Sequence, residues 1–233
     1  MTKNIITIDG PAGSGKSTVA KILARELGLK YIDTGAMYRA ITLIALQNNI
    51  DYNDEKSILK IAVNIEIELD NNSVDENKYT MIKLNGTDVT DEIRSMEVGA
   101  AVSIVSKLSG IRKYLVSLQR KFIEKGNAVL EGRDTGSVVC PDATLKIYLT
   151  ASLEERIKRR ILQMKGNGQL FKKNIIKKEI TERDRIDSTR KDSPLIIPAN
   201  GVIVDTTKMS IREVVDKIKK LYDKKANVKD KTR

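Results

Sequence analysis

Nine residues near the N-terminus, Gly10 to Thr18, have the spacing of a loop that binds phosphate. They read Gly-Pro-Ala-Gly-Ser-Gly-Lys-Ser-Thr and match the pattern G-x-x-x-x-G-K-[ST]. Such a loop curls around an anion, and its amides and the start of the next helix point at the phosphates. Lys16 can reach the β- and γ-phosphates, and the Ser17 hydroxyl can ligate Mg²⁺. The expected triphosphate-binding residues are Gly10, Pro11, Ala12, Gly13, Ser14, Gly15, Lys16, Ser17 and Thr18.

The flanking sequence supplies the setting that this loop requires. An apolar run over residues 4–8 predicts a buried strand directly before it. A helix is expected from about Gly15, with an apolar face of Val19, Ile22, Leu23 and Leu27. A glycine-rich turn that binds no ligand would not require a buried strand before it and an amphipathic helix after it. The motif therefore predicts binding of a nucleoside triphosphate, and leaves open what happens to the phosphate.

The composition limits the chemistry that the chain can perform. It has 233 residues, 40% of them hydrophobic, and no histidine. The absence of histidine excludes serine–histidine and cysteine–histidine catalysis and histidine metal sites, whereas phosphoryl transfer depends mainly on positioning and charge. One cysteine, Cys140, excludes an internal disulfide and favours a reducing cytoplasm. No apolar stretch reaches the length of a membrane span, and the N-terminal residues predict a strand rather than a signal peptide.

The net charge of +11 indicates anionic ligands, either nucleic acid or small polyphosphates. Aromatic residues make up 4% of the chain and Trp is absent, so few side chains could stack on bases. We therefore expect no nucleic-acid partner. Part of the excess charge lies in residues 223–233, which are rich in lysine, lack an apolar pattern and predict a flexible basic tail.

Strands and helices are expected to alternate along most of the chain. This pattern predicts a parallel α/β sheet with helices on both faces. The expected strands cover about 4–8, 31–32, 128–130, 145–149 and 202–204. A helix is expected from about 36 to 47, and another helical pattern from about 91 is expected to end at Gly126. Capping boxes, Ser152 with Glu155 and Ser210 with Glu213, predict the starts of two later helices.

Two segments depart from this alternation. Val63, Ile65, Ile67 and Leu69 alternate with polar residues, residues 78–84 predict a second strand, and Asn85-Gly86 is a hairpin signal. We expect a small antiparallel insertion over about 62–92. Two charged helices, to about Lys165 and over about 173–190, are separated by Gly166-Asn167-Gly168 and are expected to form a lid over about 152–191. The remaining core would cover about 1–48, 93–150 and 200–222 of a single domain, 1–222.

Charged residues follow three of the expected strands, at Asp9-Gly10, Asp33-Thr34 and 131–134. In a parallel sheet these ends meet at one edge, where ligands bind. Arginine forks match phosphate oxygens, so the arginines near this edge are candidates for holding a second anion. Ordinary solvated helix faces remain the alternative for those on the charged helices. The candidates are Arg39, Arg133, Arg156, Arg160, Arg183 and Arg190, with Asp187 on the face of Arg183.

Four blocks together resemble the bacterial cytidylate kinase family: 6–18, 33–39 (Asp-Thr-Gly-Ala-Met-Tyr-Arg), 131–139 (Glu-Gly-Arg-Asp-Thr-Gly-Ser-Val-Val) and 182–190. The resemblance extends over about 4–222. It implies a P-loop kinase fold, with about five parallel strands, an enlarged monophosphate-binding insertion and a helical lid. It also implies transfer of the ATP γ-phosphate to CMP or dCMP, with Mg²⁺, in the cytoplasm.

The resemblance also implies a role for each site residue. The α-phosphate of the acceptor would be held by Thr34, Arg39, Arg133 and Arg190. The cytosine edge would be read by Ser103, Arg112 and Asp134, and the sugar hydroxyls by Arg183 and Asp187. Catalytic charge would come from Lys16, Arg156 and Arg160. Glu131 stands where many relatives carry Asp, which leaves its part in holding the metal open.

Other functions remain to be weighed. A GTPase needs Asn-Lys-x-Asp, and residues 77–80 fail at the last position; a transporter ATPase signature is broken after Leu108-Ser109-Gly110. A basic nucleic-acid-binding module would need a continuous basic stripe or aromatic platforms, which are not evident. Within kinases, another nucleoside monophosphate or a small hydroxyl compound is the alternative acceptor. No large self-complementary apolar face is apparent, so we expect a monomer.

Overall fold

The computed structural model describes residues 4–70, 80–166 and 172–230, and a five-stranded parallel sheet forms its centre. The strand order is β2-β6-β1-β7-β8, and every neighbouring pair is parallel. The five strands are β1 (Ile5–Asp9), β2 (Lys30–Asp33), β6 (Ala128–Gly132), β7 (Leu145–Thr150) and β8 (Val202–Asp205). The predicted parallel sheet is confirmed. Because β1 is central, the loop that follows it lies in the middle of the sheet edge.

Helices cover both faces of this sheet, as expected. Ile6 and Ile8 pack with α1 (Lys16–Leu27) and α8 (Ile211–Asp230) on one face. Ile5 packs on the opposite face with residues of α5 (Ser109–Phe122) and of η2 (Thr135–Val139), a short π-helix. Successive side chains of a strand point to opposite faces, so Asp9 lies on the same side as Ile5 and faces η2.

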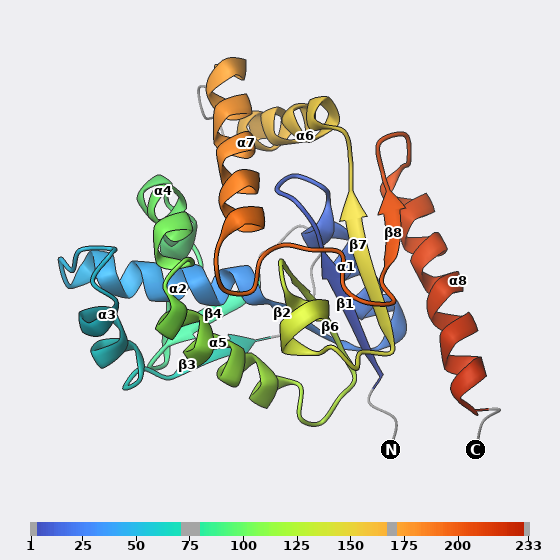
Figure 1. The fold of residues 1–233 in the computed structure, drawn as a ribbon, viewed down its shortest axis with the longest axis horizontal. Coiled ribbons are helices and arrows are strands. Elements are labelled where there is room, and N and C mark those ends of the chain that lie inside the picture. The colour runs from blue at the N-terminus through green and yellow to red at the C-terminus, as the bar shows by residue number, and fades with distance from the viewer. Residues whose placement is uncertain (1–3, 71–79, 167–171, 231–233) are drawn as a thin grey trace.

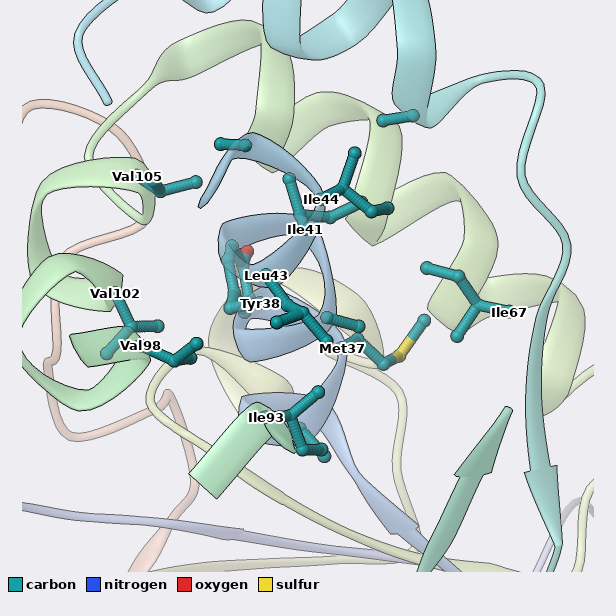
Figure 2. Packing of buried hydrophobic residues seen from close by; sticks show 14 of the residues in the cluster. Met37, Tyr38, Ile41, Leu43, Ile44, Ile67, Ile93, Val98, Val102 and Val105 are labelled. Carbon is teal, nitrogen blue, oxygen red and sulfur yellow. The ribbon is translucent and has the colours of Figure 1, made fainter. Parts of the chain in front are cut away.

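A second hydrophobic cluster surrounds α2 (Thr34–Gln47), which follows β2. Met37, Ile41 and Ile44, spaced along one face of this helix, are buried. Tyr38 and Leu43 are buried too, because other elements enclose the helix on several sides. Figure 2 shows side chains of α4 pointing toward those of α2. The enclosing elements are α3 (Glu55–Ala62), η1 (Glu92–Arg94), α4 (Met96–Val105) and part of α5. This packing fixes the start of α2, which carries Thr34 and Arg39.

The predicted antiparallel insertion is present as a three-stranded sheet, ordered β3-β4-β5. Its strands are β3 (Ile67–Asp70), β4 (Met81–Leu84) and β5 (Thr87–Asp88). The hairpin prediction is confirmed: Asn85 and Gly86 have φ values of 49° and 79°, as a two-residue type I′ turn requires. The expected strand start at Val63 is wrong, because α3 extends to Ala62 and the strand begins at Ile67. Residues 78 and 79 lie outside the described part.

Two helices, α6 (Leu153–Gly166) and α7 (Lys173–Thr189), stand over the carboxyl ends of the strands and are called the lid below (Figure 1). Ile157, Ile176 and Ile180 form a small core between them. The segment Gly166-Asn167-Gly168, which the sequence places between these helices, falls partly on residues 167 and 168, which are outside the described residues. Helix α7 ends at Thr189, so Arg190 is its C-cap rather than its last helical residue.

The two predicted capping boxes differ. At α8, the Ser210 hydroxyl accepts from the Glu213 amide at 3.3 Å, and the Glu213 carboxylate accepts from the Ser210 amide at 2.8 Å, so this box is confirmed. At α6, the Ser152 hydroxyl accepts from the Glu155 amide at 3.3 Å. The reciprocal bond is missing there, because the Ser152 amide donates to Thr207 and the Glu155 carboxylate binds Arg159.

The last helix is longer than the sequence pattern indicated. A flexible tail was expected from residue 223, but α8 continues to Asp230. Three lysines and one alanine make up half of residues 223–230, and both residue types favour helix even without an apolar face. Residues 231–233 are outside the described part. Within the described chain, no helix combines the length and the apolar character needed to cross a membrane.

Candidate active site

The loop from Gly10 to Thr18, called the phosphate loop below, joins β1 to α1 where the sequence predicts it. Gly10 has a φ of 151°, and a Cβ atom there would lie 2.0 Å from the Leu149 carbonyl oxygen of β7. Only glycine permits this close passage of the backbone. Gly15 is the N-cap of α1, with a φ of 93°. The first amides of α1 therefore open into the loop, as an anion site at a helix N-terminus requires.

Lys16 is folded over this loop. Its ammonium group donates to the Pro11 carbonyl at 2.8 Å and lies 3.4 Å from the Ser14 hydroxyl. Burial lowers the pKa of Lys16 well below its ordinary value, and the charge of Arg133 lowers it further, whereas Glu131 opposes the shift. The side chain is thus a buried cation with neutral partners, which an anion placed in the loop would stabilise.

The Ser17 hydroxyl meets the carboxylate of Glu131, at the end of β6. Ser17 donates to Glu131 Oε2 at 2.8 Å, and the Tyr31 hydroxyl donates to Oε1. Burial raises the pKa of Glu131 to about 7, and the charge of Asp33 acts in the same direction. Tyr31 was not singled out in the sequence, because only the pairing of β2 with β6 brings it to Glu131.

The Ser17–Glu131 pair fits Mg²⁺. Mg²⁺ prefers oxygen ligands and usually takes one or two from the protein, with phosphates and waters completing the shell. A hydroxyl and a carboxylate that already touch supply such a pair. Among the described residues, no group of three or more His, Cys, Asp or Glu side chains could hold a metal by itself. The chain therefore offers a partial shell that substrate phosphates can complete.

Arginines from α2, α6, α7 and the turn after β6 act on one another electrostatically, and two of them, Arg133 and Arg183, also act on Lys16 of the phosphate loop. Burial lowers the pKa of Arg183 to about 9, and the charges of Arg133, Arg39 and Arg160 lower it further, whereas Asp187 opposes them. Burial also lowers the pKa of Arg39, the charge of Asp33 opposes this shift, and Arg94, Arg160 and Arg133 add to it. Positive neighbours thus disfavour the charges of Arg183 and Arg39, whereas nearby carboxylates, Asp187 first among them, outweigh burial and raise the pKa of Arg133. The structure thus brings within electrostatic reach of one another four of the six arginines that the sequence offers as candidates for holding an anion.

Asp187 organises the acceptor side of this group. Its carboxylate accepts from Arg133 Nε at 2.7 Å and from Arg190 Nη1 at 3.1 Å. Burial raises the pKa of Asp187, but Arg133, Arg183 and Arg190 outweigh this effect, so that the pKa lies below its ordinary value. Arg190 therefore reaches the group although α7 has ended before it.

The three residues expected to read the base lie near one another. Arg112, fully buried on α5, is 2.5 Å from the Asp134 carboxylate and donates to the Ser106 carbonyl at 2.9 Å. Ser103 joins them only indirectly, because its carbonyl accepts from the Ser106 hydroxyl at 3.3 Å. The Arg112 guanidinium also lies 5.1 Å from the centre of the Tyr38 ring. The sequence analysis missed Tyr38, although it lies in the block 33–39.

Several buried polar atoms around Asp134 have no partner within the described chain. They are Tyr38 Oη, Arg112 Nε and Arg190 Nη2. Burial raises the pKa of Tyr38, and the nearby charge of Asp134 adds to this shift. Unpaired buried donors are costly, so their convergence indicates a place for a polar ligand.

Two lid arginines, Arg156 and Arg159, donate hydrogen bonds to the phosphate loop, and only the first of them was expected there. Arg156 Nη1 donates to the Ala12 carbonyl at 3.0 Å. Arg160 is exposed and donates to Gln163 at 2.8 Å, although its charge acts on Arg39 and Arg183. The sequence analysis missed Arg159, which donates to the Ser14 carbonyl at 3.2 Å. Its spacing of three residues from Arg156 on α6 was the available signal.

Two further side chains fix the backbone under the site. The Asp9 carboxylate, fully buried, accepts from the Thr135 amide and hydroxyl, both at 2.8 Å, and from the Gly136 amide at 2.7 Å. This contact anchors the turn that follows Asp134. The Thr34 hydroxyl donates to the Glu131 carbonyl at 2.7 Å and so ties the start of α2 to β6.

Comparisons with known proteins show which family the chain resembles over almost its whole length. A family model described as cytidylate kinase matches residues 6–224. A cytidylate kinase of Caldanaerobacter subterraneus subsp. tengcongensis is 49% identical over 213 residues, covering 91% of this chain and 92% of the relative. One from Listeria welshimeri is 47% identical over 228 residues, covering 97% and 100%. An uncharacterized protein of known structure from Eubacterium ventriosum has a TM-score of 0.53 at 15% identity, covering 96% of this chain and 99% of that chain, which bears on the fold alone. The chain belongs to the cytidylate kinase family.

Proposed function

We propose that this protein transfers the γ-phosphate of ATP to CMP or dCMP, giving ADP and CDP or dCDP. The observation that carries the proposal is the group of arginines beside the phosphate loop, where burial and neighbouring positive charges lower the pKa of Arg183 and Arg39 although carboxylates lie nearby. Such a group is costly until anions occupy it. Two phosphorylated ligands meeting there would balance the charge and lie close enough to react.

On the donor side, the phosphate loop and the start of α1 bind the triphosphate through backbone amides, and Lys16 turns from the Pro11 carbonyl to the phosphates. Ser17 and Glu131 would hold Mg²⁺, which when bound neutralises phosphate charge. Arg156 and Arg160 add positive charge from the lid. Phosphoryl transfer gains most from such positioning and charge stabilisation, so the absence of histidine is no obstacle.

On the acceptor side, the side chains of Arg39, Arg133, Arg190 and Thr34 hold the α-phosphate of the acceptor. Arg183 and Asp187 bind the sugar hydroxyls, and Ser103 and Arg112 complete the base site. The Asp134 carboxylate accepts a hydrogen bond from the exocyclic amine of cytosine. Uracil has a carbonyl there, which would leave the buried Asp134 facing another acceptor. The site therefore favours CMP and dCMP over UMP.

An ADP-release assay tests this function directly. Purified protein, ATP and Mg²⁺ are mixed separately with CMP, dCMP, UMP, AMP and GMP. We expect rapid ADP release with CMP and dCMP, and slow release with the other three. Equal turnover of CMP and UMP would contradict the role of Asp134. Turnover confined to AMP or GMP, or seen with none of the five, would contradict the proposed acceptor.

A further inference from the structure

Asp184, on the lid helix α7, bonds to both the phosphate loop and a lid arginine. Its Oδ1 accepts from the Ala12 amide at 3.0 Å, and its Oδ2 accepts from Arg156 Nη1. The same Arg156 nitrogen donates to the Ala12 carbonyl at 3.0 Å, and Arg156 Nε donates to the Ala151 carbonyl at 3.1 Å. The Ala12 amide thus donates to the Asp184 carboxylate, and the Ala12 carbonyl accepts from the Arg156 guanidinium.

This closed set of bonds limits where the guanidinium can lie. An arginine side chain has several rotatable bonds and gives up conformational entropy when it is held in one place. Carboxylate bonds to a guanidinium are charge-assisted and directional, so Asp184 can supply that restraint. The Asp184 side chain is 22% exposed and that of Arg156 is 11% exposed, so water screens this pair only in part.

Asp184 is also distinct from the other carboxylate on the inner side of α7. Asp187, one turn later, binds Arg133 and Arg190 on the acceptor side. Asp184 binds Arg156 and Ala12 on the donor side. Asp184 and Asp187 therefore lie three residues apart on α7, and each binds arginine side chains of a different half of the site.

We infer that Asp184 is a positioning residue for phosphoryl transfer: it holds the Arg156 guanidinium against Ala12 of the phosphate loop and thereby couples the lid to the bound donor. This inference rests on the proposed function, because it concerns the same transfer. The carboxylate does not touch the reacting atoms, and it acts through Arg156. Any movement of α7 relative to the loop therefore changes the place of this arginine.

The test is a double-mutant cycle. Asp184→Asn, Arg156→Lys and the double variant are assayed for kcat, KM for ATP, KM for CMP and thermal unfolding. We expect Asp184→Asn to lower kcat by roughly 10- to 100-fold, as loss of a supporting contact does at other sites, with KM for CMP nearly unchanged. The two substitutions should not be additive in kcat, because they act on one interaction. Asp184→Glu, which keeps the charge but displaces it, should also lower kcat.

The control is Glu182→Gln on the same helix, where an exposed carboxylate binds Arg185. It should leave kcat unchanged. Fully additive losses in the cycle, or an unchanged kcat for Asp184→Asn, would overturn the inference. Tighter ATP binding without loss of kcat would also overturn it, and would show instead that the carboxylate competes with phosphate for the Ala12 amide. Wild-type turnover of CMP is measured first, so that failure of the proposed function is recognised separately.

Discussion

The hydroxyl of Ser17, in the phosphate loop, donates a hydrogen bond of 2.8 Å to the carboxylate of Glu131, 114 residues further along the chain. This contact joins the donor loop to β6, the strand that leads into Arg133 and Asp134. The carboxylate also accepts from Tyr31 and is buried. The pKa of this carboxyl group is therefore raised, and its ionisation affects the stability of the protein in the absence of substrate.

The stability of the ligand-free protein should fall as the pH rises through the pKa of Glu131. Burial and Asp33 raise this pKa from 4.5 to about 7, so the folded state holds a proton that the unfolded state has released. Stability from this group is complete below about pH 4.5 and is lost as the pH rises through about 7. Denaturant unfolding between about pH 5 and 8 measures it, in a chain without histidine to titrate in that range.

Glu131→Gln supplies the comparison, because glutamine cannot ionise. As the pH rises, the unfolding free energy of the wild-type protein should fall relative to that of Glu131→Gln. Ionisable groups that do not interact with Glu131 are common to both proteins and cancel, whereas Lys16, whose pKa Glu131 raises, contributes through the same pair. A difference that stays constant across this range would contradict the assignment of a raised pKa to Glu131.

Lys16→Met should remove most of the activity without unfolding the protein. The ammonium group is buried with neutral partners, so its loss leaves no carboxylate unpaired. Losing one preorganised donor to a transition-state charge costs roughly 10²–10³-fold in kcat. Steady-state ADP release with CMP measures the change. Lys30→Met, at the exposed start of β2, is the matched control and should retain full activity.

Asp134→Asn should narrow the preference for CMP over UMP. A well-placed polar contact to a base edge discriminates by about 1–3 kcal/mol, which is roughly 5- to 150-fold in the ratio of kcat/KM values. The amide can also donate to the uracil carbonyl, so kcat/KM for UMP should rise while that for CMP falls. Asp91→Asn, an exposed aspartate without a side-chain capping bond, is the control. An unchanged ratio would show that Asp134 does not read the base.

Thr135→Val should destabilise the protein by about 1.5–3 kcal/mol, the usual value of a hydrogen bond to a charged group. The substitution keeps the shape of the side chain and removes the hydroxyl bond to Asp9. Thr135→Ser keeps the hydrogen bond to Asp9 and should lower the unfolding free energy much less than Thr135→Val does. Thr7→Val is a sharp control, since the buried Thr7 hydroxyl has no partner in the described structure. Equal losses for Thr135→Val and Thr7→Val, measured by urea unfolding, would show that the Asp9 contact contributes nothing.

The sequence was a good guide wherever the signal was local. The strand, loop and helix around Gly10 follow from neighbouring residues, and the Asn85-Gly86 hairpin follows from two residues that accept positive φ. The error at Val63 has a local cause as well. A helix end followed by a short turn produced alternation by coincidence, and the pattern could not separate it from a strand.

Contacts that depend on the order of strands could not be predicted from the sequence. Asp33 lies opposite Glu131 because β2 pairs with β6, and Asp9 lies opposite Gly132 because β1 pairs with β6 on its other side. Periodicity identifies strands but does not say which ones are neighbours. The partners of Glu131 and Asp9, and the contact of Arg159 with the loop, therefore appear only in the folded chain.

Arg183→Gln should stabilise the ligand-free protein and weaken acceptor binding at the same time. Arg183 is half-buried among Arg133, Arg39 and Arg160, and burial with this repulsion lowers its pKa to about 9. Removing the charge relieves the repulsion, and we expect a gain of about 0.5–2 kcal/mol in unfolding free energy, typical of stabilising substitutions. The same change removes a ligand contact, so KM for CMP should rise.

Arg185→Gln on the same helix is the matched control, because Arg185 is exposed and bound to Glu182. This substitution should change neither the unfolding free energy nor KM for CMP appreciably. Inorganic sulfate should raise the melting temperature of the wild-type protein more than that of Arg183→Gln, since an anion relieves the repulsion only where the charge is present. A loss of stability in Arg183→Gln without sulfate would mean that the arginine is compensated by Asp187 rather than strained. The arginine group would then stabilise the ligand-free fold, and phosphate binding would not depend on a group that lowers the free energy of unfolding.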